Sequence, residues 1–344
     1  MGEYRRIMVA ADNSPASALA AQWGVALARR CGATVTAVHV YNARQHEFAF
    51  RKMEVSLPPA HQDPAALAEQ RSAHQTLIQD SLGLIAHCYL GGVKRRCEEE
   101  GVPFEGKTIE GKHYLALSEE AANHGLICLG AQGLGWVAGS LIGSVCERVL
   151  RRCRADVLIA RRNERDEGNA KPQTAGWPAP KAIAVGVDGS EHSLAAVRHA
   201  AWMAETFGAS LEGIYVFDPF FHSLAFNRMK GVLSAEADCL FRTGDQEALH
   251  DAVINKGLRH VGERHLQVAS EAARPWVQEM VGTVLEGKPF VRIASHAESS
   301  GTDLLVVGRF GSHFSPAADI GSTAENLARL VPCSVLVVNS QSRS

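Results

Sequence analysis

Two runs of glycine and serine at the same spacing contain the residues best suited to chemistry in this chain. The shared pattern, Gly-x2-Gly-x9-Gly-Ser, is formed by Gly130, Gly133, Gly143 and Ser144, and again by Gly308, Gly311, Gly321 and Ser322. Each Gly-Ser pair opens a helical pattern. A helix start presents free backbone N–H groups and a positive dipole end, and glycine lets the backbone approach an anion closely. The pattern therefore predicts two phosphate sites, in which the serine both caps the helix and binds a phosphate oxygen.

A structural alternative needs no ligand. In it, the glycines only form tight turns, and Ser144 or Ser322 only caps its helix.

The sequence excludes two familiar phosphate-binding motifs. The chain contains no Gly-x4-Gly-Lys-Ser/Thr, so it has no P-loop. The segment GAQGLG lacks the glycine order of a dinucleotide fingerprint, and it follows the fourth predicted strand instead of the first.

The second half of the chain repeats the first. Matching segments are 7–14 with 183–190, 35–42 with 211–218, and 126–133 with 304–311. The first two pairs are 176 residues apart and the third is 178 apart, so a two-residue insertion precedes the later glycines. The same segments in the same order indicate a duplication. It predicts nucleotide-binding domains at 1–161 and 181–344, joined by an exposed linker at 162–180 that is charged and then rich in Pro, Gly and Ala.

Each half alternates short apolar runs with longer helical patterns, which predicts a parallel sheet with helices on both faces. In the first half the expected helices are 15–31, 64–100, 113–123 and 141–153, and the strands are RRIMVAA, TVTAVHV, VPFEGKTI, GLICLG and ADVLIA. In the second half the expected strands are 181–187, 210–217, 281–286, 303–308 and 334–339. The fold class is therefore α/β, with two doubly wound domains that each contain a five-stranded, mainly parallel sheet. Ligands of such sheets bind beyond the carboxyl ends of the strands, where the loops after the first and fourth strands meet.

This combination resembles the universal stress protein family. The resemblance rests on the Gly-x2-Gly-x9-Gly-Ser spacing, on opening strands that end in Asp-x-Ser, and on the βαβ order, and it covers nearly the whole chain except the linker. It implies an ATP site in each half, as in the ATP-binding branch of the family. It also implies that the last strands, ADVLIA and SVLVV, pair edge to edge as a pseudo-twofold intramolecular pair, with a further homodimer left open.

The resemblance also assigns roles to residues. Adenine and ribose would contact Asp12 and Val40 in the first half, and Asp188 and Val216 in the second. Phosphates would contact Gly130, Gly133, Gly143, Ser144 and Val145, and in the second half Gly308, Gly311, Gly321, Ser322 and Thr323. Asp12 and Asp188 have the alternative of capping the following helix. The next position, often a hydroxyl residue in the family, is Cys146 or Ala324, which weakens the expected hold on phosphate. No catalytic or metal-binding residue is expected.

The two predicted sites differ in their nine-residue loops. The first loop, LGWVAGSLI, is apolar and contains glycine, whereas the second, SHFSPAADI, is stiffened by Pro316 and contains Asp319. A carboxylate at Asp319 would repel phosphate unless it holds a Mg²⁺ ion or turns away, and Arg309 could compensate for it. The sequence therefore favours the first site.

Composition and residue spacing argue against a nucleic-acid-binding, membrane-spanning or metal-binding protein. A formal charge of −2 gives no broad basic field for nucleic acid, and no apolar run is long enough to span a membrane. The eight cysteines contain no Cys-x-x-Cys pair, which favours a reducing cytoplasm. The closest histidine cluster, His250, His260 and His265, has a spacing that favours a solvated surface over a metal site.

Three functions stay open at this stage. The first is a cytoplasmic regulator or sensor of the stress response that binds ATP or a related adenine nucleotide and contacts an unidentified protein partner. The second is a scaffold that acts through protein contacts with one or both sites empty. The third is a nucleotide-using enzyme, such as an adenylating one, although no residues remain for a substrate domain. The motif supplies no evident general base or arginine finger, so at most slow ATP hydrolysis is expected.

Overall fold

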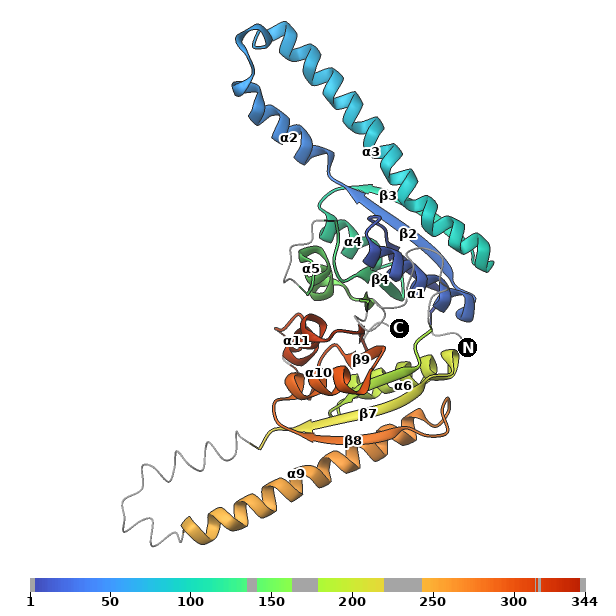
Figure 1. The fold of residues 1–344 in the computed structure, drawn as a ribbon, viewed down its shortest axis with the longest axis vertical. Coiled ribbons are helices and arrows are strands. Elements are labelled where there is room, and N and C mark those ends of the chain that lie inside the picture. Colours follow the sequence, from blue (N-terminus) through green and yellow to red (C-terminus); the bar gives the residue numbers. More distant parts are fainter. Residues whose placement is uncertain are drawn as a thin grey trace. The chain divides into compact units, whose positions relative to one another are not determined.

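The computed structural model describes residues 4–134, 141–162, 179–219, 243–312, 314 and 317–340 (Figure 1). The chain divides into two compact units, the first ending at Arg161 and the second beginning at Arg162. Most of the predicted linker, 163–178, lies outside the described residues.

Unit 1 is built on a five-stranded sheet in the order β3-β2-β1-β4-β5, in which every pairing is parallel. Its strands are β1 (Arg6–Ala10), β2 (Thr34–Tyr41), β3 (Phe104–Glu110), β4 (Leu126–Gly130) and β5 (Asp156–Ala160). Its helices are α1 (Pro15–Cys31), α2 (Ala43–Met53), α3 (Pro64–Glu100), α4 (His113–Ala121) and α5 (Ser144–Arg152), with 3-10 turns at Glu54–Ser56 and Pro59–His61. α1 and α3 lie on one face of the sheet, and α4 and α5 lie on the other (Figure 1).

Unit 2 repeats this arrangement, with a parallel sheet in the order β8-β7-β6-β9-β10. Its strands are β6 (Ala182–Val187), β7 (Ser210–Phe217), β8 (Val281–Glu286), β9 (Leu304–Gly308) and β10 (Ser334–Val338). Its helices are α6 (Glu191–Phe207), α9 (Thr243–Ala273), α10 (Pro289–Ser300) and α11 (Ser322–Leu330). The predicted fold class is confirmed for each unit, while the pairing of β5 with β10 stays a prediction.

The duplication extends to the register of the strands. Ile7 in β1 pairs with Val35 and Leu126, and its counterpart Ile183 in β6 pairs with Leu211 and Leu304. The predicted two-residue insertion lies between the third and fourth strands of unit 2, because β8 ends 176 positions after β3 and β9 begins 178 positions after β4. Two copies with one register place equivalent residues at the same edge of each sheet.

The first crossover helix of each unit begins at a serine. Ser14 caps α1 by accepting a hydrogen bond from the Ser17 backbone N–H, and Ser190 caps α6 through Ser193 in the same way. Both helices end at a glycine in the left-handed conformation, Gly32 with φ 70° and Gly208 with φ 67°. These helices cover the central strands, which are buried at nearly every position.

The helix α2 was not predicted from the sequence. It packs against the first half of the 37-residue α3, and the two helices form a hairpin that extends beyond the sheet (Figure 1). Glu54 joins them, since its carboxylate accepts two hydrogen bonds from the Arg71 guanidinium at 2.7 and 2.6 Å. Apolar side chains of this hairpin are exposed at Phe48, Val55 and Leu84.

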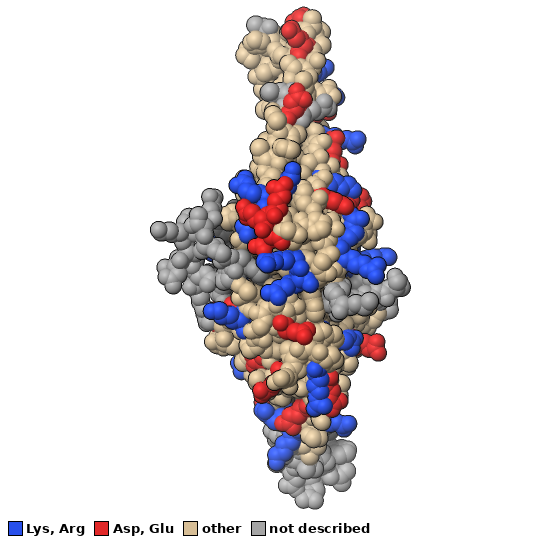
Figure 2. Space-filling model, turned by 90° about the vertical axis from the view of Figure 1, so that its right-hand side faces the viewer, with Lys and Arg blue, Asp and Glu red and all other residues tan. Residues whose placement is uncertain are grey.

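Charge is mixed on the visible surface. Figure 2 shows basic and acidic side chains interspersed over the face that it presents. None of the described helices is long and apolar enough to cross a membrane.

Stability should fall at acidic pH, in part because of His124. Its Nδ1 donates to the Glu120 carbonyl at 3.0 Å, while its buried Nε2 has no partner among the described residues. Burial lowers the pKa of this imidazole, so the unfolded chain takes up a proton near its ordinary pKa of about 6.5 while the folded chain does not. Each pH unit below that point, down to the folded pKa, should cost up to about 1.4 kcal/mol. His124→Asn should reduce the loss of stability between pH 7.5 and 5.5, measured by urea unfolding.

The exposed His61 supplies the control. His61→Asn should leave the pH dependence of stability as it is in the parent protein. An unchanged pH dependence in His124→Asn would show that this imidazole does not contribute.

Candidate functional site

The loops after the first and fourth strands meet at the carboxyl edge of each sheet. In unit 1, a Cβ on Gly133 would stand 2.7 Å from Asp12 Oδ2. In unit 2, a Cβ on Gly311 would stand 2.6 Å from Asp188 Oδ2. The aspartate thus lies directly against the second glycine of the Gly-x2-Gly turn, at a distance that no side chain on the glycine would permit.

The turn is also fixed to the helix that follows it. The Gly143 N–H donates to the Ala131 carbonyl at 2.7 Å, and the Gly321 N–H donates to the Arg309 carbonyl at 2.9 Å. One backbone hydrogen bond per unit therefore joins the Gly-x2-Gly turn to the Gly-Ser pair. The two parts of the predicted motif form a single site.

Within the described residues, the helix that follows this turn starts at a glycine without a side-chain cap. Gly143 is the N-cap of α5 and Gly321 is the N-cap of α11, and neither makes a side-chain cap hydrogen bond. Ser144 and Ser322 are the first helical residues, and both are exposed. The expectation that these serines cap their helices is wrong, because the glycine occupies the cap position. The first N–H groups of each helix consequently keep their capacity to bind an anion.

The residues that follow divide between the site and the core. Val145 and Thr323 are half-buried, whereas Cys146 and Ala324 are buried beneath the helix. Burial raises the pKa of the Cys146 thiol to about 12, so it stays protonated at neutral pH. The position that is often a hydroxyl residue in relatives contributes packing here.

Gly130 and Gly308 have a role that requires no ligand. A Cβ on Gly130 would stand 2.7 Å from the Ala16 carbonyl carbon and 2.8 Å from the Ser17 nitrogen. A Cβ on Gly308 would stand 2.7 Å from the carbonyl of His192. The fourth strand of each unit thus ends against the backbone at the start of the first helix, and this contact accounts for both glycines.

Val40 and Val216 lie where the second strand runs past the end of the first. The Val38 carbonyl accepts a hydrogen bond from the Ala11 N–H at 2.9 Å, so Val38 directs its peptide groups toward β1. Alternate residues of a strand face the same neighbour, so Val40 directs its own N–H and C=O that way, beyond the end of β1. Those groups form an edge to which a planar base can hydrogen-bond. Val216 has the equivalent position in β7.

Neither aspartate caps a helix. The Asp12 carboxylate accepts a hydrogen bond from the Ser14 N–H at 3.0 Å, and Asp188 accepts one from the Ser190 N–H at 2.9 Å. Each aspartate stabilises the turn before the helix, and the serine two positions later, Ser14 or Ser190, is the N-cap.

An arginine steadies the long loop of each unit. In unit 1 the Arg161 guanidinium donates to the Leu141 carbonyl at 2.9 Å. In unit 2 Arg309 Nε donates to the carbonyl of Asp319, the equivalent position, at 2.9 Å. Arg161 was not predicted as a site residue, although it directly follows β5, beside the end of β4. Arg309, expected to compensate for the Asp319 charge, is buried and donates a hydrogen bond to the Asp319 backbone.

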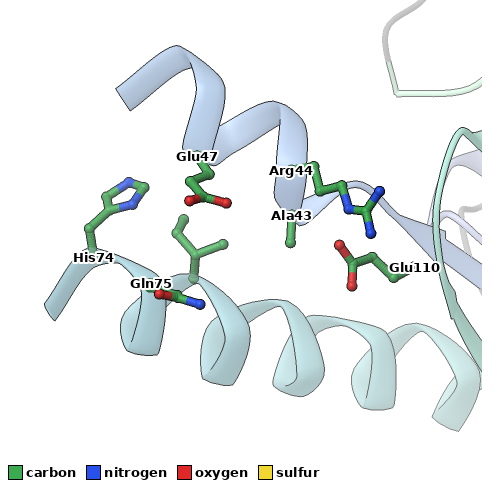
Figure 3. Close-up of a pocket in the computed structure, with 7 residues that line it drawn as sticks. Ala43, Arg44, Glu47, His74, Gln75 and Glu110 are labelled. Carbon is green, nitrogen blue, oxygen red and sulfur yellow. The ribbon is translucent and has the colours of Figure 1, made fainter. Parts of the chain in front are cut away.

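A cavity of about 170 Å³ lies elsewhere in unit 1, between α2, α3 and the end of β3. Figure 3 shows Arg44 reaching toward Glu110 on one side and His74 facing the helix of Glu47 on the other. None of the predicted site residues lines it. Among the described residues, no group of three or more His, Cys, Asp or Glu side chains is arranged to hold a metal ion.

Comparison with known proteins identifies relatives of both units. A family model described as the Universal stress protein family matches residues 3–161 and 180–339. A universal stress protein of Methanocaldococcus jannaschii is 32% identical over 160 residues, which cover 46% of this chain and 81% of the relative. One of Mycobacterium tuberculosis strain H37Rv is 24% identical over 331 residues, covering 96% of this chain and 95% of the relative.

The fold is similar to that of solved structures along nearly the full chain. A universal stress protein from Archaeoglobus fulgidus has 16% identity and a TM-score of 0.55, with coverage of 97% of this chain and 95% of that one. A functionally unknown protein from Pseudomonas aeruginosa PAO1 also has 16% identity and a TM-score of 0.55, with coverage of 98% and 93%. At this level of identity the likeness concerns the fold alone.

Gly130→Ala should destabilise unit 1 by about 1–3 kcal/mol in the absence of nucleotide. The added methyl group would overlap the backbone of Ala16 and Ser17, which cannot move away as a flexible side chain could. Urea unfolding of the ligand-free protein measures the change. Gly92→Ala, at an exposed position of α3 with open space around it, should instead stabilise by about 0.5–1 kcal/mol. Equal stability of Gly130→Ala and the parent would contradict the close strand–helix contact.

Proposed function

Because the chain belongs to the universal stress protein family, we propose that it binds ATP or a related adenine nucleotide and acts in the stress response as a nucleotide-dependent regulator or sensor. The observation that carries this proposal is the helix start without a side-chain cap beside the Gly-x2-Gly turn. Gly143 and Gly321 leave the first N–H groups of α5 and α11 without a side-chain cap. Such groups bind phosphate through hydrogen bonds and the helix dipole.

The residues around the helix start fit the parts of a nucleotide. The N–H groups of Ser144 and Val145, with the exposed Ser144 hydroxyl, would hold phosphate oxygens. Arg161, which contacts the loop just before Gly143, adds positive charge on the same side. A Mg²⁺ ion bound with the phosphates would reduce the charge that these groups must balance.

The nucleoside would lie over the ends of the first two strands. The Asp12 carboxylate is an acceptor for ribose hydroxyls, and the peptide groups of Val40 match the hydrogen-bonding edge of adenine. Val40 is buried, so its side chain would offer the base an apolar contact.

Binding would regulate by ordering the loop between the turn and the helix. Loops 131–142 and 309–320 are the segments concerned, and 135–140, 313 and 315–316 lie outside the described residues. Hydrolysis is expected to be slow, because the motif supplies no evident general base. A cytoplasmic location is part of the proposal and is supported by the seven described cysteines, none of which is in a disulfide bond.

A second candidate is a scaffold that acts through protein contacts with its sites empty. The observation that favours it is the α2–α3 hairpin, where Phe48, Val55 and Leu84 are exposed. A scaffold of this kind would purify without nucleotide and would not gain thermal stability from ATP.

The two candidates are separated by a glycine substitution. Purified protein should show an excess of nucleotide absorbance, and ATP should raise its melting temperature. Gly143→Val together with Gly321→Val should abolish both effects, since the new side chains stand at the helix starts. A Cβ on Gly143 would be 3.4 Å from the Ala131 carbonyl oxygen and one on Gly321 would be 3.1 Å from the Arg309 carbonyl oxygen, so urea unfolding of the double variant is the control for its fold.

Ser144→Ala provides the milder control, because it removes one hydroxyl and leaves the N–H groups. It should weaken ATP binding by about tenfold or less. A parent protein with no bound nucleotide and no melting shift would reject the proposal in favour of the scaffold.

A further inference from the structure

The carboxylates of the two units make different hydrogen bonds. Asp188 accepts three: from the Ser190 N–H at 2.9 Å, from the Ser190 hydroxyl at 2.6 Å, and from the Ser312 N–H at 2.8 Å. Asp12 accepts one among the described residues, from the Ser14 N–H at 3.0 Å. The Ser14 hydroxyl is directed instead to the Gln132 carbonyl at 3.3 Å.

The difference concerns the oxygen that faces the turn. In both units Oδ2 lies against the second glycine, as the close approach to Gly133 and Gly311 shows. In unit 2 this oxygen also accepts the next N–H of the turn, that of Ser312. The residue equivalent to Ser312 is Leu134, whose N–H makes no such bond to Asp12. Asp12 Oδ2 therefore keeps its acceptor capacity for a ligand hydroxyl.

Aromatic side chains reinforce the turn of unit 2. The Phe310 and Phe314 rings pack at 4.5 Å between centroids, and His192 packs against Phe310 at 5.3 Å. His192 Nδ1 also hydrogen-bonds the Ser340 hydroxyl at 2.6 Å. The equivalents of Phe310 and His192 in unit 1 are Gln132 and Ala16, which cannot form such a cluster.

A second pair of rings lies beside Gly189, the residue after Asp188. The His265 imidazole of α9 lies so close to Gly189 that a Cβ there would stand 2.2 Å from the ring. Tyr215 packs beside His265, and burial, together with the Asp188 charge, raises the pKa of its phenol. In unit 1 the residue equivalent to Gly189 is Asn13, which also has a positive φ, of 62°.

The corresponding rings of unit 1 lie differently. Tyr89 packs edge-on against His39 with centroids 5.0 Å apart, and His39 Nδ1 donates to the Ala11 carbonyl at 2.6 Å. His39 is thereby held against the end of β1 instead of over the turn that follows Asp12. Among the described residues of the first site, Asp12 Oδ2 accepts no hydrogen bond.

We propose that unit 1 alone takes up the nucleotide, and that Asp188 acts in unit 2 as a latch that holds the Gly311–Ser312 turn closed against the start of α6. A nucleotide entering unit 2 would have to replace hydrogen bonds to a charged acceptor, which are among the stronger ones in proteins. This inference rests on the proposed function, because it assigns the ligand to one of two candidate sites.

Calorimetric titration of the full chain with ATP tests the assignment. The expected result is one nucleotide per chain and complete loss of binding in Gly143→Val. Two sites per chain, or one site retained in Gly143→Val, would overturn the inference and leave the proposed function standing. Absence of binding by the parent protein would overturn the proposed function and the assignment together.

Amide hydrogen exchange tests the latch without nucleotide. The Ser312 N–H should exchange at least about tenfold more slowly than that of Leu134, because only the former is bonded to a carboxylate. Asp188→Asn should speed the exchange of Ser312, since a neutral acceptor forms a weaker hydrogen bond. Equal rates at Ser312 and Leu134 in the parent protein would show that no latch exists.

Discussion

The contact on which each site depends is that of an aspartate carboxylate with a glycine that has no side chain. Asp12 lies against Gly133 and Asp188 against Gly311 because the first and fourth strands are neighbours and end at the same edge of the sheet. The backbone hydrogen bond from Gly143 to Ala131 then fixes the turn to the start of α5. The start of the helix and the carboxylate thus both adjoin one turn.

One backbone frame supports two electrostatic arrangements. The registers of the strands agree between the units, yet a few substitutions change what surrounds the acid. Where unit 1 has Ala16 and Gln132, unit 2 has His192 and Phe310, which pack together beside the turn. The frame is common to both units because most residues of the central strands are buried, whereas the loop residues differ.

The long loops of the two units are held by arginines that stand at different positions in the two repeats. Arg161 holds the Leu141 carbonyl after β5, and Arg309 holds the Asp319 carbonyl after β9. The two arginines are not equivalent in sequence, but the ends of adjacent strands lie side by side, so either position reaches the loop. Pairing of the halves by sequence alone could not find this correspondence. The correspondence of the two arginines follows only from the positions of the strand ends at the edge of each sheet.

The sequence by itself determined the duplication and the order of the strands and of most helices. It also predicted that the loops after the first and fourth strands meet at one edge of each sheet. Both follow because apolar periodicity and glycine spacing are local properties of the chain. Tertiary structure decided the rest. It made Gly143 the cap instead of Ser144, gave Gly130 a packing role against Ala16, and added α2, whose place depends on contact with α3. It also distinguished Asp12 from Asp188. Asp188 accepts a hydrogen bond from Ser312, more than a hundred positions away, whereas Asp12, within the described residues, accepts one only from the neighbouring Ser14, and contacts between distant residues leave no periodic signal in a sequence.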